Sequence, residues 1–297
     1  MSIEPDTFAL DRSAVMRSFG RAATHYERSA WLQRRVRAEL LDRLQFFSLA
    51  PQRVLDLGAG TCQSALELHR RFPKAQVIAL DLAEGMLREA PRPRWPWQPR
   101  LALVCADAQQ LPLATHCVDL IYSNLMLQWC DQPDVAFAEL ARVLKPGGLM
   151  LFSTFGPDTL KELRGAWCSV DSHDHVSRFL DMPQLGDALA RAGFAEPVLD
   201  VEHHQAHYPD VRALMRELKQ LGARNAMSKR TRGLTGRTRF AAMLATYEQL
   251  RTKAGLPATF EVIAGAAFAI GNAPGSGRGG ERGEIAIPID AIRRTRR

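Results

Sequence analysis

The chain has 297 residues, a hydrophobic fraction of 46% and a formal net charge of +7, so it can build a substantial core and favours acidic partners. No apolar run reaches the roughly eighteen residues of a membrane span, and the N-terminus lacks the layout of a signal peptide. We therefore expect a cytoplasmic protein that does not enter a membrane. The five cysteines are scattered and include no C-x-x-C pair, which argues against a disulfide framework or a structural zinc site.

The expected elements begin with helix and continue as an alternation of strand and helix. Residues 12–46 carry a helical pattern that we expect to break at Gly20. The expected strands cover residues 53–57, 76–81, 101–106, 118–123, 148–155, 197–208 and 258–270. A helix is expected at 157–167, and two more, at 209–223 and 237–253, precede the last strand. Such an alternation is typical of a doubly wound α/β sheet.

The segment VLDLGAGTC at residues 54–62 is the most informative motif. It predicts a buried strand that ends at Asp56 and turns through Gly58 and Gly60 into a helix, because glycine lets the backbone approach a ligand closely. Asp81 ends the following strand, where a carboxylate can accept both hydroxyls of a ribose. A cofactor that carries a nucleoside is therefore expected at the carboxyl edge of the sheet.

The same motif favours S-adenosylmethionine over a dinucleotide. A dinucleotide-binding turn has a third glycine in G-x-G-x-x-G, and this chain has Gln63 at that position. Asp56 would repel a pyrophosphate but suits the ammonium group of a ligand without phosphate. We therefore expect S-adenosylmethionine to be bound by Asp56, Gly58, Ala59, Gly60 and Asp81.

Further candidates for cofactor binding follow the neighbouring strands. Asp107 can accept the exocyclic amine of adenine, and the backbone N–H of Ala108 can donate to the ring. Leu82 and Met86 would flank the adenine with apolar surface. Asn124 follows the fourth strand, where the methionine part would lie. Open α/β sheets bind their ligands at this edge.

We expect three segments in the chain. Residues 1–50 form an N-terminal helical segment that covers the site, residues 51–270 form the sheet domain with a helical insertion at about 208–257, and residues 271–297 form a flexible basic tail. Five parallel strands and a late pair, in the order found across residues 53–155 and beyond, resemble the Rossmann-like, seven-stranded class I methyltransferases. Many members of that family have a third glycine where this chain has Cys62.

Three other motifs allow a narrower match. The first, FxxAAxxYxxxAxxQ, spans residues 19–33, and the second, FSTFGPDTLKEL, spans residues 152–163 after the fifth strand. The third comprises YPD at 208–210 and LMRELK at 214–219. Together with the cofactor motifs they cover the chain to about residue 268, and they resemble the malonyl-acyl-carrier-protein O-methyltransferases of biotin synthesis.

The resemblance implies methyl transfer from S-adenosylmethionine to the free carboxyl of a malonyl thioester, on acyl carrier protein or on CoA, early in biotin synthesis. A carboxyl group with a pKa near 4 is ionised at neutral pH, so it needs no general base. We assign no catalytic residue beyond two candidates for positioning that carboxylate by a hydrogen bond, Tyr26 and Ser153.

The basic residues and the histidines suggest two further kinds of site. The acidic carrier protein is expected to dock on four basic side chains, Arg216, Lys219, Lys229 and Arg230. A nucleic-acid partner is not expected, because no aromatic residues alternate with the lysines and arginines to provide stacking platforms for nucleobases. His203 and His204 lie in a strand pattern and should face opposite sides of the sheet, so we expect no metal.

Other acceptors and other roles stay open at this point. The same cofactor half would serve a methyltransferase for a quinone precursor, another small carboxylic acid or a protein of respiratory assembly. A chain that only binds the cofactor, as an assembly or regulatory protein, is slightly favoured by Cys62 and disfavoured by the intact Asp56, Asp81 and Asp107. An amino-group methylase is disfavoured, because the fourth strand leads into SNLM at 123–126 and not into N/D-P-P-Y/F.

Overall fold

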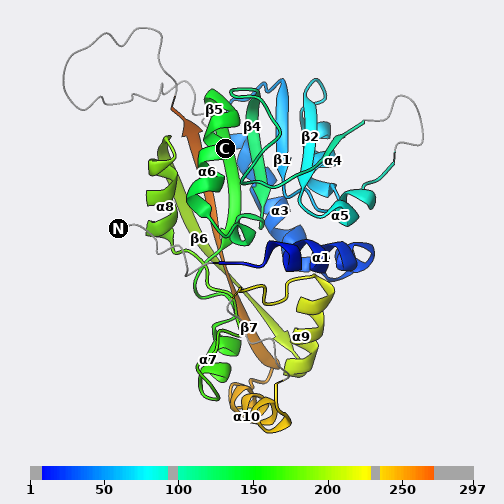
Figure 1. The fold of residues 1–297 in the computed structure, drawn as a ribbon, viewed down its shortest axis with the longest axis vertical. Helices are drawn as coiled ribbons and strands as arrows, with labels where there is room; N and C mark the ends of the chain where they lie inside the picture. The colour runs from blue at the N-terminus through cyan, green and yellow to red at the C-terminus, as the bar shows by residue number, and fades with distance from the viewer. Residues whose placement is uncertain (1–8, 93–99, 229–234, 271–297) are drawn as a thin grey trace, which may run out of the picture.

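Seven strands form one mixed sheet that runs through the molecule (Figure 1). The computed structural model describes residues 9–92, 100–228 and 235–270. In chain order the strands are β1 (Arg53–Leu57), β2 (Gln76–Asp81), β3 (Ala102–Cys105), β4 (Val118–Asn124), β5 (Leu144–Phe155), β6 (Phe194–Tyr208) and β7 (Leu256–Ala269). Their order in the sheet is β3-β2-β1-β4-β5-β7-β6, with β7 antiparallel to both neighbours and the first five strands parallel. The predicted class I arrangement of five parallel strands and a late pair is confirmed.

Helices cover both faces of the sheet and the end at which the parallel strands finish. The helices of the described ranges are α1 (Arg12–Ala22), α2 (Tyr26–Ser29), α3 (Trp31–Arg43), α4 (Gln63–Arg71), α5 (Glu84–Arg88), α6 (Pro133–Val143), α7 (Lys161–Cys168), α8 (Met182–Arg191), α9 (Val211–Gln220) and α10 (Arg237–Glu248), with 3₁₀ turns η1 (Ala23–His25), η2 (Leu44–Phe46) and η3 (Leu127–Trp129). None of the described helices is both long and apolar enough to cross a membrane.

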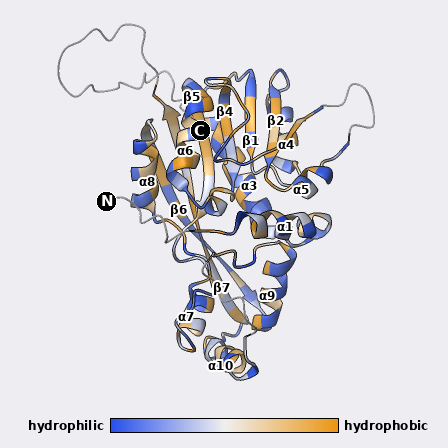
Figure 2. Ribbon diagram, in the orientation of Figure 1, coloured by the Kyte–Doolittle hydropathy of each residue, from blue (hydrophilic) through white to orange (hydrophobic). Residues whose placement is uncertain are grey.

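The parallel strands β1, β2 and β4 are apolar at most positions because both of their faces are buried, whereas the edge strand β3 is partly exposed. Successive side chains of a strand point to opposite faces. Leu55 therefore packs in one core with α6 and α8, and Val54 in the other with α3 and α4. Figure 2 shows these apolar residues in orange along the central strands. The bounds predicted for β1 and β2 match the structure for this reason.

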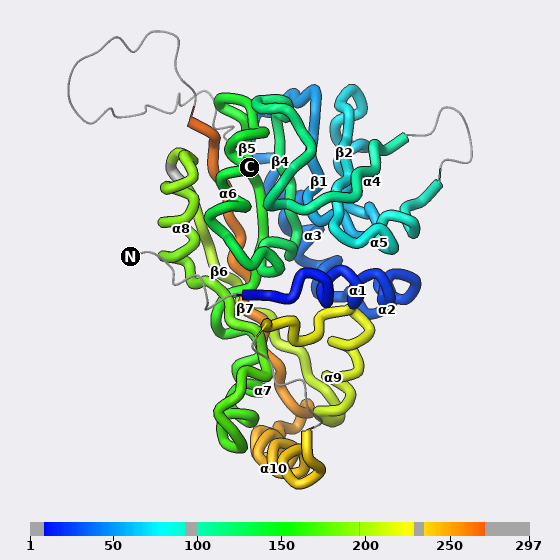
Figure 3. The backbone as a smooth tube through the Cα atoms, viewed as in Figure 1, coloured from blue at the N-terminus to red at the C-terminus, as the bar shows by residue number. Residues whose placement is uncertain are grey.

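The outer pair β6 and β7 extends beyond β5 and carries a second lobe. Pairing of β5 with β7 ends at Phe155 and Val262, whereas β6 and β7 stay paired as far as Tyr208 and Leu256. Helices α7, α9 and α10 surround this extension (Figure 1) and share a separate apolar core with it. Helix α1 lies across the junction of the two parts (Figure 3).

Helix α1 continues through Gly20, so the predicted break there is wrong. Helices α1 and α5 cross closely at this point: a Cβ on Gly85 would lie 2.9 Å from the carbonyl oxygen of Gly20. The two glycines therefore allow close helix packing, and the helical segment is interrupted later, at η1 and at Ala30.

The turn between β5 and α7 is fastened to β7. Helix α7 begins at Lys161, later than the predicted residue 157, because the residues before it bond to the neighbouring strand. The backbone N–H of Asp158 donates to Glu261 Oε2, and Thr159 Oγ1 donates to the Glu261 carbonyl over 3.0 Å. A Cβ on Gly156 would lie 2.5 Å from Glu261 Cδ. Much of the motif at 152–163 thus builds this turn.

Candidate functional site

The G-x-G turn after β1 is tied to the end of β2. The N–H of Gly58 donates to the Leu80 carbonyl and the N–H of Gly60 donates to Asp81 Oδ2, each over 2.8 Å. Both glycines have positive φ, 72° and 54°, which costs glycine little. A Cβ on Gly58 would lie 2.1 Å from Met126 Cγ, whereas a Cβ on Gly60 would meet nothing within 4 Å. Gly60 therefore faces open space.

That open space belongs to a cavity between the strand ends and α1, which we call the cofactor cavity. Residues predicted to bind the cofactor form much of its lining: Gly58, Gly60, Asp81, Leu82, Met86, Asp107, Ala108 and Asn124. Helix α1 closes the other side with Val15, Met16 and Phe19, and Tyr26 also lines it. Ala59 lines an adjoining pocket over the same turn. The fold therefore brings most of the residues that were predicted to bind the cofactor together around one cavity.

Asp81 is held rigidly at the edge of this cavity. Its Oδ1 accepts the N–H of Ala83 over 2.8 Å while its Oδ2 accepts that of Gly60. Burial raises the pKa of Asp81, and the two hydrogen bonds oppose that shift. Because each carboxylate oxygen can accept more than one hydrogen bond, both retain capacity for ligand hydroxyls.

Asp56 lies beneath the turn and lines neither the cofactor cavity nor the adjoining pocket. Only 1% of the residue is exposed, and its Oδ2 has no hydrogen-bond partner among the described residues. Burial, aided by the negative charge of Asp81, raises the pKa of Asp56 to about 8. Its pairing with the ammonium group of the cofactor stays a prediction. Because Asp56 lies beneath the turn, any effect of its carboxyl on the cofactor would be transmitted through the turn.

Cys62 stands at the end of the same turn with its side chain in the core. It is the N-cap residue of α4 and has φ 64°, ψ 23°. Its side chain is buried with Ala65 and Leu68 and lines no part of the cofactor cavity. Burial raises the pKa of the Cys62 thiol to about 12. Compared with the glycine that many family members have here, Cys62 changes how readily the backbone of the turn adopts its positive φ, and it leaves the wall of the cofactor cavity unchanged.

Arg12 joins helix α1 to the segment after β3 and to the segment before α6. Its guanidinium lies 2.9 Å from Asp107 Oδ2 and 2.8 Å from Asp131 Oδ1. The other oxygen of Asp107 accepts the N–H of Gln109 over 2.9 Å. The carboxylate predicted to meet adenine is thus oriented by the helix that closes the cavity.

The two positioning candidates take different places. Ser153 is fully buried, donates to Asn124 Oδ1 over 3.0 Å and accepts the N–H of Leu125 over 3.0 Å. It lines no part of the cofactor cavity, so it orients Asn124 from behind. Tyr26 does line the cavity, and burial, with nearby carboxylates, raises its pKa well above the ordinary value. Its hydroxyl therefore stays protonated at neutral pH.

Sequence reasoning missed Arg37, which comes from α3. It lines the pocket that adjoins the cofactor cavity, together with Tyr26, Gln33 and Asn124. Its Nε lies 3.2 Å from Glu67 Oε1, and its side chain is 16% exposed. No motif marks this arginine, because only the packing of α3 on the sheet brings it to the turn.

Trp129, which the sequence analysis also did not identify, lies at the meeting point of three cavities. It lines the cofactor cavity, an aromatic chamber of about 320 Å³ and a groove of about 680 Å³ between α1 and α9. Phe19 holds its ring edge-on, with the centroids 5.1 Å apart. The chamber is lined by five aromatic rings, Trp31, Phe155, Trp167, Phe179 and Phe260, besides Trp129.

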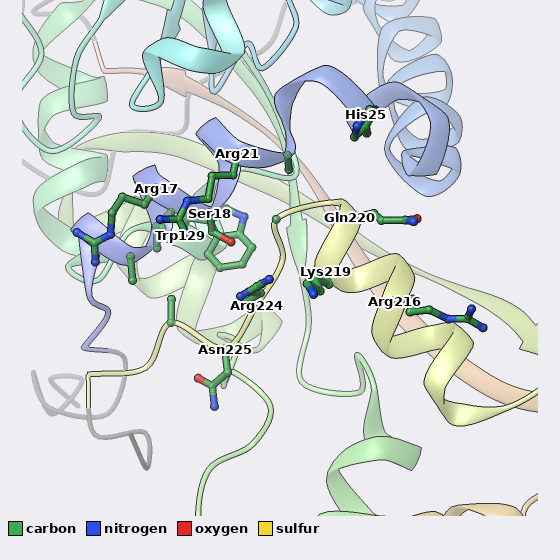
Figure 4. A pocket seen from close by; sticks show the side chains of 15 residues that line it. Arg17, Ser18, Arg21, His25, Trp129, Arg216, Lys219, Gln220, Arg224 and Asn225 are labelled. Carbon is green, nitrogen blue, oxygen red and sulfur yellow. The ribbon is translucent and has the colours of Figure 1, made fainter. Parts of the chain in front are cut away.

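The groove between α1 and α9 is basic (Figure 4). Its lining includes two of the predicted docking residues, Arg216 and Lys219. The other two, Lys229 and Arg230, lie outside the described residues. Three arginines that the sequence analysis did not single out also line it, namely Arg17, Arg21 and Arg224.

Two clusters of potential metal-ligating side chains lie away from this site. One comprises Glu39, Glu202 and His204, and the other Asp158, His203 and Glu261. His203 and His204 thus belong to different clusters on opposite faces, as their spacing predicts. Basic side chains reach both clusters: Arg35 pairs with Glu39 and Glu202, and Lys161 pairs with Asp158. The expectation of no metal stays a prediction.

Comparison with known proteins assigns the family. Residues 55–152 match the family model of a methyltransferase domain. The malonyl-[acyl-carrier protein] O-methyltransferase of Methylovorus sp. (strain MP688) is 50% identical over 268 residues, which cover 89% of this chain and 90% of that protein. The enzyme of the same name from Halorhodospira halophila (strain DSM 244 / SL1) is 44% identical over 98% of this chain and 99% of its own. The chain belongs to the malonyl-[acyl-carrier protein] O-methyltransferase family.

A solved structure supports the fold of this family member. A putative methyltransferase from Bacillus halodurans C-125 superimposes with a TM-score of 0.56 at 17% identity, over 79% of this chain and all of that one. The cofactor of the methyltransferase is S-adenosylmethionine, as predicted. The cavity suits it, since Gly60 leaves open space beside the turn and Asp81 presents a fixed carboxylate there.

Proposed function

We propose that this methyltransferase esterifies the free carboxyl of a malonyl thioester carried by an acyl carrier protein. The observation that carries the proposal is the meeting of the cofactor cavity, the aromatic chamber and the basic groove at Trp129. Such a junction provides a methyl donor, an apolar place for a thioester arm and positive charge for an acidic carrier. The names of the relatives support the same acceptor.

Specific side chains would hold the cofactor. Asp81 would accept the ribose hydroxyls, Leu82 and Met86 would flank the adenine, and Asp107 with the N–H of Ala108 would meet its edge. Arg37 lines the pocket over the turn and would hold the methionine carboxylate. When bound, the cofactor would supply a methyl group on a sulfonium sulfur. The methyl carbon can accept an electron pair from a nucleophile while the electrons of the C–S bond stay on the sulfur, which leaves S-adenosylhomocysteine.

The acceptor carboxylate needs placement more than activation. It is ionised at neutral pH, so no base has to remove a proton. The Tyr26 hydroxyl, which like any tyrosine is protonated at neutral pH, can donate one hydrogen bond to it, and Asn124 lines the same cavity. Alignment of this kind can contribute roughly 7–11 kcal/mol in favourable cases. Ser153 would serve by holding Asn124.

The same site keeps strong positive charge away from the attacking oxygen. A close ion pair would stabilise the carboxylate before reaction and so weaken it as a nucleophile. No arginine or lysine of the described residues lines the cofactor cavity. Arg12 pairs with carboxylates at its rim, and Arg17, Arg21 and Arg224, which have no ion-pair partner among the described residues, line the groove outside it. Closure by Phe19 and Trp129 would exclude water from the reacting atoms.

Esterification would remove the charge of the malonyl carboxylate. A neutral methyl ester can enter apolar acyl-binding sites that reject an ion, because burying an unpaired charge is costly. Masking this charge would suit an early step in biotin synthesis, as the resemblance of the sequence motifs implies. The acceptor would dock through the basic groove, with Arg216 and Lys219 on the exposed side of α9.

The proposal is tested with a set of acceptors and labelled S-adenosylmethionine. Malonyl-carrier protein, malonyl-CoA, free malonate and acetyl-carrier protein are each incubated with the enzyme and the cofactor. We expect label in a methyl ester of the malonyl thioesters and none in acetyl-carrier protein, which has no free carboxyl. Absence of label from every malonyl thioester, by a protein that still binds S-adenosylhomocysteine, would refute it.

A further inference from the structure

We infer that Arg17, Arg21 and Arg224 form a binding site for the phosphodiester of the arm by which an acyl group is attached to its carrier protein. This inference rests on the proposed function and deepens it. It gives these three arginines the phosphate, and leaves Arg216 and Lys219 of the same groove to contact the body of the carrier.

The charge of the groove is the first ground. No aspartate or glutamate of the described chain lines it, whereas Arg17, Arg21 and Arg224 all do. None of these three arginines has an ion-pair partner within the described ranges. By contrast, Arg12 and Arg37, from the same N-terminal helices, each pair with a carboxylate. Unpaired guanidinium groups around a common space suit a phosphate, which they can bind with two parallel hydrogen bonds.

The placement of the three side chains is the second ground. In Figure 4, Arg17 and Arg21 come from α1 and Arg224 comes from the segment after α9. The Trp129 ring lies between Arg21 and Arg224, and the Arg17 guanidinium points away from Arg224. Arg224 lines both the groove and the aromatic chamber. A negative group held there would lie where the groove leads to the junction.

The rigidity of the groove walls is the third ground. Backbone hydrogen bonds join the two walls: Asp11 N–H donates to the Ala226 carbonyl over 2.8 Å, and Ser228 N–H donates to that of Ala9 over 2.9 Å. Gly222, at φ 77°, approaches so closely that a Cβ there would lie 3.1 Å from the backbone of Phe19. The arginines therefore project from walls whose spacing is fixed before a ligand arrives, which lowers the cost of binding.

The chemistry of the arm fits this order of sites. Its phosphodiester lies at the end attached to the carrier, an amide-containing pantetheine chain follows, and the thioester lies at the far end. With the phosphate bound by Arg21 and Arg224 beside the Trp129 ring, the chain would continue past that ring and bring the acyl group to the cofactor cavity. The polar side chains of Ser18 and Asn225 line the same groove and could meet its amides.

The test compares two small acceptors that differ only in the phosphate, malonyl-pantetheine and malonyl-4′-phosphopantetheine. We expect the wild-type kcat/KM to be at least about tenfold higher for the phosphorylated acceptor, since charge-assisted hydrogen bonds are strong. In Arg21→Gln/Arg224→Gln this ratio should fall close to one, with little change for malonyl-pantetheine. Arg70→Gln, at an exposed arginine of α4 that lines no part of the groove, is the control and should keep the ratio. An unchanged ratio in the double variant, or no preference in the wild type, would overturn the inference.

A binding measurement separates failure of the phosphate site from failure of the proposed function. Titration calorimetry of the full chain with S-adenosylhomocysteine present would compare 4′-phosphopantetheine with pantetheine, neither of which bears an acyl group. Preferential binding of the phosphorylated compound that depends on Arg21 and Arg224, without methyl transfer to any malonyl thioester, would uphold the site and refute the function. Methyl transfer without any preference for phosphate would refute the site alone.

Discussion

Trp31 donates its indole Nε1–H to Glu217 Oε1 over 2.8 Å, and the Tyr208 hydroxyl donates to the same oxygen over 2.8 Å. One carboxylate thereby joins α3 of the N-terminal segment, the end of β6 and helix α9. Trp31 and Glu217 both line the aromatic chamber. The wall of the proposed acceptor site thus depends on a contact between segments far apart in the chain.

Replacing Glu217 by alanine should damage acceptor binding more than cofactor binding. The change leaves two partly buried donors without their acceptor, which costs about 1–3 kcal/mol of unfolding free energy. We expect KM for malonyl-carrier protein to rise and the Kd for S-adenosylhomocysteine to stay within twofold or so. Glu217→Gln, which keeps an acceptor oxygen, is the control and should lie close to wild type. A larger loss of cofactor affinity than of acceptor affinity would contradict this view of the chamber.

Asp81→Asn should weaken cofactor binding strongly. An asparagine offers one acceptor oxygen, so one of the N–H groups of Gly60 and Ala83 would face an amide NH₂ group. We expect the Kd for S-adenosylmethionine to rise roughly 10- to 100-fold by calorimetry, from a loss of about 1–3 kcal/mol.

Asp119→Asn is the matched control for that variant. Asp119 also accepts two backbone N–H groups, those of Gln52 and Arg53, but at the opposite edge of the sheet. Both bonds use one oxygen, Oδ2, so asparagine can keep them. This variant should retain wild-type cofactor affinity. Equal losses in the two variants would indicate general damage to the sheet and no specific contact with the ribose.

The sequence alone could predict the cofactor edge of the fold. Strands β1 and β2 are covered on both faces, so their apolar runs have clear bounds. The order of strand, turn and helix then places Gly58, Gly60 and Asp81 at one edge without further information. The helix break predicted at Gly20 is wrong. A glycine that permits close packing, as Gly20 does against Gly85, cannot be distinguished in the sequence from a glycine that ends a helix.

The acceptor side could be predicted only by resemblance. Trp129 lies in η3 and Arg224 lies after α9, and no periodicity connects them. They line the same groove only because helix α1 packs across the junction of the two lobes. The conspicuous motif at 152–163 owes part of its pattern to its bonds with Glu261, a residue about a hundred positions away.

The buried carboxyl of Asp56 should make the unliganded protein less stable as pH rises. Its folded-state pKa of about 8 lies above the ordinary value of 3.8, so the folded state holds this proton more tightly than the unfolded chain does. Between about pH 4 and pH 8 the unfolding free energy therefore falls with rising pH through this group, and above about pH 8 this fall ends.

Thermal unfolding of Asp56→Asn tests that linkage. The uncharged side chain has no such proton, so the decline of Tm from about pH 5 to about pH 8 should be smaller than in the wild type. Asp119→Asn should keep the wild-type slope in this range. A wild-type slope that survives in Asp56→Asn would show that Asp56 is ionised in the folded protein throughout.

Charge reversal on α9 should weaken carrier binding and spare the cofactor. We expect Arg216→Glu/Lys219→Glu to raise KM for malonyl-carrier protein by about tenfold or more at low salt, and less at high salt, where exposed charges are screened. Arg70→Glu/Arg71→Glu changes the net charge equally at exposed positions of α4, on another side of the molecule, and should leave KM unchanged. Parallel loss of cofactor affinity in the α9 variant would refute the docking role.

The most direct test of the central claim is a single turnover with methyl-labelled S-adenosylmethionine and malonyl-carrier protein, followed by mass spectrometry of the carrier's acyl group. We expect one added methyl group, on the free carboxyl oxygen, as an ester that alkaline hydrolysis removes. A methyl group on carbon, or on the protein part of the carrier, or no transfer by enzyme that binds the cofactor, would contradict it.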